Sequence, residues 1–203
     1  MFHRQPDPSA SDVEAARATA TTSTRAEIDR VTGSVVSPAL VRPALVASGN
    51  KDLCDFGRHN WKVNDSYDLA CSQDRDTVVG FDVETFRAQA VALHAALVAD
   101  GWVESEMHLD RVVSEYWDAR ASFGNPLYGV SDLPAASYTR ADRRQLITVA
   151  WLDSTASDLD TALGNPWGDV AVIHDVVDEE TVRNALVGKR YAVTIRIGTT
   201  YWQ

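Results

Sequence analysis

Basic residues are scarce in this sequence. Its 203 residues include 19 Lys and Arg against 29 Asp and Glu, which gives a formal net charge of −10. Non-specific binding to nucleic acid requires basic patches that release phosphate counterions, and adsorption to anionic lipid requires positive charge as well. The acidic balance therefore argues against both functions and favours a basic protein among the partners.

Apolar runs of the length found in membrane segments are also missing. No stretch approaches the roughly 18 uninterrupted apolar residues that indicate a transmembrane helix. Met1–Pro6 becomes polar at once, so we do not find the apolar centre of a secretory signal in the chain. The composition, 45% hydrophobic and 24% charged, is typical of a globular protein rather than a disordered one.

Short motifs of common active sites are absent too. The sequence contains no GxSxG, HExxH, P-loop or GxGxxG motif. Its two cysteines do not form a CxxC pair, which gives zinc-ribbon or thioredoxin chemistry no support. We therefore expect no cofactor, and a binding protein is better supported than an enzyme.

The charge and the aromatic residues are unevenly distributed along the chain. Residues 1–50 contain five Arg and five Asp or Glu, so residues 51–203 carry the whole net charge of −10. Sixteen of the 17 aromatic residues and both cysteines also follow residue 50. Because aromatic side chains contribute much of a buried core, we expect a stalk or arm over 1–50 and a compact acidic domain over 51–203.

The first 50 residues carry only weak signals of structure. Ser11 and Glu14 form a capping box, from which a helix can run to about Val31. Its apolar residues are too sparse for a deep core face, so we expect a lightly docked helix. Val35–Ala47 contains two prolines and few charges, which predicts an irregular segment.

A β-hairpin is predicted over His59–Cys71. A three-residue turn at Asn64–Ser66 pairs Trp61 with Leu69 and keeps the apolar side chains on one face. A two-residue turn at Asn64 and Asp65 would instead place Trp61 opposite an aspartate, so we prefer the first register.

The two cysteines lie close to this hairpin. Cys54 precedes it and Cys71 ends it, 17 positions apart. We expect a disulfide between them, which implies an oxidising compartment. The alternative is two unrelated thiols.

The remaining patterns predict further helices and strands. A well-capped helix begins near Phe81 and Asp82, ends at Gly101 and is followed by Trp102, which can fold back onto it. The other expected elements are helices over Ser105–Ala121 and Asp178–Val187, and strands over Gln145–Leu152, Val170–Ile173 and Tyr191–Ile197. Strands and helices do not alternate strictly, so we expect an α+β fold. This would be a mainly antiparallel sheet with helices packed on one face, preceded by an N-terminal helical arm.

Candidate site residues are few. None of the five His makes an HxH or HxxxH pair, and His94 is interpreted as an ordinary helix residue. His174, Asp175 and Asp178 are weak candidates for a metal site, because a carboxylate can orient an imidazole. A strand end followed by a helix cap is the simpler explanation, and we prefer it. Acidic clusters such as Asp74–Asp76 are interpreted as solvated turns, or as contacts for a basic partner. No catalytic residue is assigned.

Residue usage and element order together suggest a class of protein. The sequence has 16 Arg against three Lys and is rich in Ala, Val and Asp, which resembles proteins of high-GC Gram-positive bacteria. The arm, the pair Cys54 and Cys71, and the helix ending at Leu97–Trp102 resemble the organisation of their small membrane-anchored or secreted cell-envelope proteins. The resemblance implies an extracytoplasmic location and an anchor outside these 203 residues, and it implies no site residues.

These observations support three hypotheses. The leading one is a non-enzymatic, tethered extracytoplasmic domain that binds or scaffolds a basic protein or another envelope component. The second is a cytoplasmic acidic interaction protein, of the inhibitor or immunity type, for a basic partner. The third is a metal-assisted hydrolase that uses His174, Asp175 and Asp178.

Overall fold

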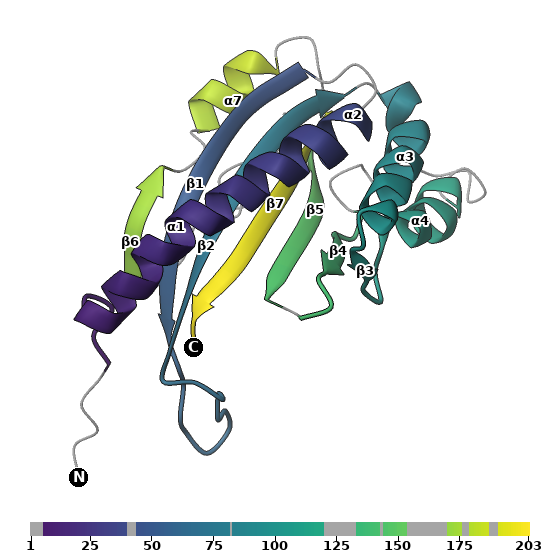
Figure 1. Ribbon diagram of the computed structural model, residues 1–203. Coiled ribbons are helices and arrows are strands. Elements are labelled where there is room, and N and C mark those ends of the chain that lie inside the picture. Colours follow the sequence, from purple (N-terminus) through teal and green to yellow (C-terminus); the bar gives the residue numbers. More distant parts are fainter. Residues whose placement is uncertain are drawn as a thin grey trace.

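The computed structural model describes residues 6–39, 44–81, 83–119, 133–142, 144–153, 170–175, 179–186 and 191–203 (Figure 1). In this part of the chain the strands form one antiparallel sheet in the order β3-β4-β5-β7-β2-β1-β6. The sheet and its helices confirm the predicted α+β class.

The strands are β1 (Ala44–Phe56), β2 (Leu69–Phe81), β3 (Val103–Glu104), β4 (Ala136–Thr139), β5 (Gln145–Asp153), β6 (Val170–Asp175) and β7 (Tyr191–Trp202). The helices are α1 (Ser11–Val31), α2 (Ser37–Ala39), α3 (Phe86–Ala99), α4 (Leu109–Arg111) and α7 (Glu179–Ala185). A π-helical turn at Thr32–Val36 joins α1 to α2, a 3₁₀ turn at Val83–Thr85 precedes α3, and a second π-helical turn at Val112–Trp117 continues α4.

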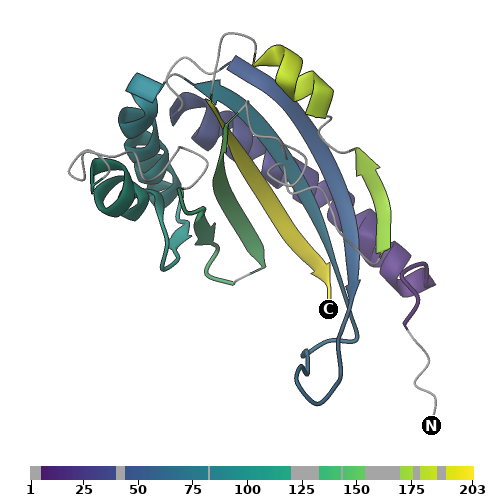
Figure 2. The same cartoon turned by 180° about the vertical axis from the view of Figure 1, so that it is seen from behind.

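Helices cover the two faces of the sheet unequally. α1 crosses the sheet diagonally on the same side as α3 and α4 (Figure 1), and Figure 2 shows α7 on the opposite side. Neighbouring residues of a strand point to opposite faces. Accordingly, Val79 packs with α3, whereas Val78 packs with Val182 of α7 and with Leu186, which follows that helix. The main core therefore lies between the sheet and the helices of the first face.

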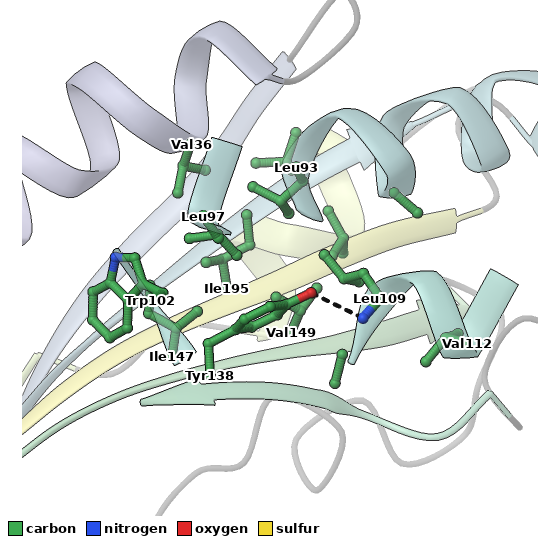
Figure 3. Packing of buried hydrophobic residues seen from close by; sticks show 14 of the residues in the cluster. Val36, Leu93, Leu97, Trp102, Leu109, Val112, Tyr138, Ile147, Val149 and Ile195 are labelled. Carbon is green, nitrogen blue, oxygen red and sulfur yellow. Dashed lines mark hydrogen bonds between the residues drawn. The ribbon is translucent and has the colours of Figure 1, made fainter. Parts of the chain in front are cut away.

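The predicted helix before Gly101 is confirmed. Phe86, Ala90, Leu93 and Leu97 recur at three- and four-residue spacing and are all buried in the main core. Figure 3 shows Leu93 and Leu97 there. Gly101 ends the helix with a φ of 83°, a left-handed conformation that favours glycine.

The chain folds back after this turn, as the sequence predicts. The Trp102 backbone N–H donates to the Leu97 carbonyl at 3.1 Å, and Trp102 is buried. The predicted cap Asp82 lies outside the described residues.

The N-terminal helix forms over the predicted residues but packs more closely than its pattern indicates. Val13, Ile28 and Val31 are all buried. The expected irregular segment over Val35–Ala47 was wrong at both ends, because its beginning is helical and its last residues belong to β1. The expected division at residue 50 falls inside that strand.

Candidate functional site

The disulfide lies where the longest strand pair ends. Cys54 and Cys71 are register partners on β1 and β2 and form a disulfide, as predicted. Both are buried with Val13 of α1 and with Leu69. The covalent link therefore holds the base of the segment that connects the two strands.

This connecting segment, Gly57–Asp68, is called the Trp61 loop below. It projects beyond the end of the sheet in both views (Figures 1 and 2). The predicted hairpin over His59–Cys71 was wrong in its strands. β1 and β2 pair upstream and downstream of the loop, and within it one isolated bridge joins His59 and Asn64.

Hydrogen bonds within the Trp61 loop define its shape. The Asn60 side-chain oxygen accepts from the backbone N–H groups of Lys62 at 2.9 Å and Val63 at 3.1 Å. At the base, the Gly57 N–H donates to the Asp68 carbonyl at 2.9 Å. A Cβ on Gly57 would lie 1.7 Å from the Tyr67 carbonyl oxygen, so this close backbone approach requires glycine.

His59 connects the two sides of the same loop. Its Nδ1 lies 3.0 Å from the Asn64 side-chain oxygen, and its Nε2 lies 3.1 Å from the Tyr67 carbonyl oxygen. The Asp68 carboxylate is 3.0 Å from Nε2. The hydrogen bond to Asn64, with the nearby charge of Asp68, raises the pKa of His59. Protonation therefore suits this loop, because an imidazolium donates from both nitrogens.

Trp61 is the most exposed large apolar side chain of the described residues. Its exposed fraction is 89%, against 49% for Val103, the next in order. The Lys62 ammonium lies 4.7 Å from the centroid of the ring, a cation–π contact on one face. The rest of the indole faces solvent, although a tryptophan is normally among the more buried residue types.

A polar cluster holds α1 against the sheet near the disulfide. Arg17 of α1 lies with its Nε 3.2 Å from an Asp52 carboxylate oxygen and 3.1 Å from the Tyr201 hydroxyl. Tyr201 in turn donates to Asp52 at 2.7 Å, and Gln73 donates to Asp52 at 3.1 Å. Burial, with the hydrogen bond to Asp52, raises the pKa of Tyr201. These polar contacts attach the helix to the sheet in a region where its apolar residues are sparse.

The Ala- and Thr-rich part of α1 leaves space above the sheet. A cavity of about 210 Å³ lies between Thr21–Ile28 and the strands β1 and β2. The residues that line it are mostly of polar types and include Asp52, Gln73 and Arg75. Small helical side chains explain the gap, because they cannot reach the strands beneath them.

A second set of charges is buried within the sheet itself. Lys51 of β1 lies with its Nζ 2.5 Å from one oxygen of Asp76, and Arg196 of β7 lies with its Nε 2.7 Å from the other. The Lys51 and Asp76 side chains are only 1% and 3% exposed. The prediction that Asp74–Asp76 forms a solvated turn was therefore wrong, since these residues belong to β2.

Asp74 belongs to the same group of charges. Burial, together with the nearby charge of Asp76, raises the pKa of its carboxyl to about 6, and Arg196 opposes this shift. A Cβ on Gly198 would lie 2.3 Å from an Asp74 oxygen, so the glycine makes room for this carboxyl. Because the pKa lies above that of an unfolded aspartate, about 4, ionising the group costs stability as the pH rises toward 6.

The weak metal candidates of the sequence are only partly located. His174 and Asp175 end β6, where they are the register partners of Lys51 and Asn50. Asp178 lies outside the described residues, so a site made of these three stays a prediction. Two other histidines do come together: the rings of His94 and His108 lie 5.4 Å apart.

Trp61 was not predicted as a surface residue, because its apolar pattern places it in a strand. Its neighbours held a better signal. Asn60, Asn64 and Asp65 are residues that bond to nearby backbone in turns, and they surround Trp61 at a density that favours a structured loop over a two-stranded ladder.

Comparisons with known proteins give no relative. No protein-family model, curated protein sequence or solved structure matches the chain. Within the described residues, no helix combines the length and apolar character needed to cross a membrane.

Proposed function

We propose that this protein is a non-enzymatic extracytoplasmic domain that binds a basic protein of the cell envelope through the Trp61 loop. The observation that carries the proposal is the 89% exposure of the Trp61 side chain on a loop cross-linked by its own hydrogen bonds. Leaving an indole in water forgoes a large burial energy, and tryptophan is enriched among the residues that dominate binding interfaces.

Pre-organisation supports the same role for the loop. The disulfide closes its base, and the Asn60 and His59 bonds fix its interior. A loop already held in shape loses less conformational entropy on binding than a flexible one. The Lys62 ammonium occupies one face of the ring, so the partner would receive the other face and the edge of the indole.

Charge defines the chemistry of the partner. The net charge of −10 would attract a basic protein over a distance set by the ionic strength. The Trp61 loop itself carries exposed charges of both signs, with Arg58 76% exposed and Asp68 77% exposed. The partner would therefore combine an apolar pocket for the indole with a basic surface that meets the acidic remainder of the domain.

The disulfide supports the location. Cys54 and Cys71 both lie in this bond, and such bonds persist in oxidising compartments. An anchor outside these 203 residues would tether the domain at the envelope, as the resemblance in organisation implies.

Capture from an envelope extract of the source cells tests the binding role. The bait is the full chain as wild type, Trp61→Ala or Val98→Ala, the last being an exposed apolar residue of α3 that serves as the matched control. We expect one basic protein to be retained by wild type and by Val98→Ala, and to fall at least about tenfold with Trp61→Ala, the scale of an interface hot spot.

Salt adds a second readout of the same experiment. Retention should weaken with increasing ionic strength, because screening removes the attraction of opposite charges. An unchanged set of captured proteins with Trp61→Ala would contradict the proposal.

A further inference from the structure

Three metal-binding side chains converge at the edge of the main core, away from the Trp61 loop. They are His94 on α3, Glu104 on β3 and His108 just before α4, and one ligand atom of each lies within 4.8 Å of the others. The His94 Nε2 is 3.4 Å from a Glu104 carboxylate oxygen. Ligands around a four-coordinate zinc ion lie about 3.3 Å apart, given metal–ligand bonds of about 2.0–2.1 Å.

The fold brings these residues together from one continuous stretch of chain. After the left-handed turn at Gly101 the chain runs back beside α3 as β3. β3 pairs with β4, and Glu104 is the register partner of Tyr138. The segment between Glu104 and His108 is fixed as well, because the Ser137 N–H donates to the Met107 carbonyl at 2.9 Å. The geometry is thus set by backbone hydrogen bonds rather than by the three side chains themselves.

Tyr138 supplies the support that a histidine ligand needs. Its hydroxyl accepts from the Leu109 N–H at 2.9 Å (Figure 3) and lies 2.9 Å from the His94 Nδ1. Metal-binding histidines use their second nitrogen in such a bond, which fixes the ring orientation. With Nε2 on an ion, Nδ1 keeps its proton and donates it to the phenol oxygen, which has two lone pairs to accept from Leu109 and His94.

His108 provides an independent observation. Its Nδ1 is buried and has no hydrogen-bond partner among the described residues. A buried polar atom without a partner is rare in folded proteins and calls for an explanation such as a bound ion. Its ring also stacks against that of His94 at an interplanar angle of 27°, an arrangement that brings two imidazoles to the same small volume.

We propose that His94, Glu104 and His108 form a binding site for a single divalent transition-metal ion, with Zn²⁺ as its best match. Two imidazoles and one carboxylate are a donor set that zinc uses when three protein ligands leave a fourth position to water. Glu104 is 43% exposed, so this position is open to solvent. The site uses other residues than the sequence candidates His174, Asp175 and Asp178.

Metal titration of the full chain tests the proposal. Protein stripped with a chelator is titrated with Zn²⁺ by calorimetry and with Co²⁺ by visible absorption, which is intense for four-coordinate cobalt. We expect one equivalent of each ion to bind. Glu104→Gln and His108→Ala should each weaken Zn²⁺ binding at least about tenfold, since even outer-shell changes cost about 10–100-fold.

Glu106→Gln is the matched control, because Glu106 stands two residues from Glu104 and its side chain is 95% exposed. It should bind Zn²⁺ as wild type does. The exposed position of Glu104 allows Glu104→Gln to fold normally, and circular dichroism of each variant checks this. The proposal is overturned if wild type binds less than one-tenth of an equivalent, or if folded Glu104→Gln and His108→Ala bind as tightly as wild type.

Discussion

Replacing Asp76 by asparagine lowers the free energy of unfolding by about 3–5 kcal/mol, the usual cost of removing one partner of a buried ion pair. The Asp76 carboxylate lies between the cations of Lys51 and Arg196, at 2.5 and 2.7 Å. The Lys51 side chain is 1% exposed, so the pair is shielded from water. An amide in place of the carboxylate removes the negative charge that lies between two cations in a medium of low dielectric constant.

Chemical denaturation of both proteins measures the difference. Asp68→Asn is the control, because Asp68 is also a carboxylate near a cationic group but is 77% exposed, and surface changes of this kind cost within about 0.5 kcal/mol. Adding Lys51→Met to Asp76→Asn should recover part of the loss, since it removes one of the two buried cations that Asp76 neutralises. A loss below about 1 kcal/mol for Asp76→Asn would mean that water or another group stabilises the ammonium, and the buried ion pair would then contribute little to stability.

Removing the disulfide is the second large effect we expect. Cys54→Ala with Cys71→Ala should lower the free energy of unfolding by about 3 kcal/mol, because the bond restricts a loop of moderate length in the unfolded chain. The cysteines are 17 positions apart, and both are buried. Wild type measured in reductant should give nearly the same value as the double variant.

Denaturation with and without reductant checks this second result. The double variant should show no response to reductant, which serves as the control for effects of the reductant itself. If wild type and the double variant differ by less than about 1 kcal/mol, the bond is not a major source of stability, contrary to the usual behaviour of native disulfides.

Where a local pattern determines an element, the sequence predicted it well. Tyr191–Ile197 shows the alternation of a strand, and β7 is a strand over these positions and extends to Trp202. The spacing of Phe86, Leu93 and Leu97 likewise predicted the buried face of α3. Both cases depend on residues that bury their own apolar side chains.

The centre of β2 was not predicted because its stabilising partners lie far along the chain. Asp76 is stabilised by Lys51 and Arg196, 25 and 120 positions away, and no local pattern reveals such a pairing. Arg17 in α1 is similar, since it is buried by Asp52 and Tyr201. Some polar residues find their hydrogen-bond or ion-pair partners on strands that are distant in the sequence. In a short stretch of sequence they cannot be distinguished from solvent-exposed residues.

The candidate sites also include one that a local pattern predicts and two that depend on the folded structure. The disulfide could be predicted, because only two cysteines occur and both flank one turn region. The exposure of Trp61 could not, because it depends on the loop bonds of Asn60 and His59. The convergence of His94, Glu104 and His108 depends on the turn at Gly101 and on the pairing of β3 with β4, which no short spacing motif records.

The proposed function requires that the bond between Cys54 and Cys71 persists in the cell, in a domain outside the cytoplasm. The most direct measurement is the redox state of Cys54 and Cys71 in intact source cells, trapped by acid, treated with an alkylating reagent and read as the mass of the chain. We predict that neither cysteine is alkylated unless the sample is first reduced, while thiols of an abundant cytoplasmic protein in the same sample are fully alkylated. Alkylation of both cysteines without reduction would contradict the claim and would favour a cytoplasmic interaction protein.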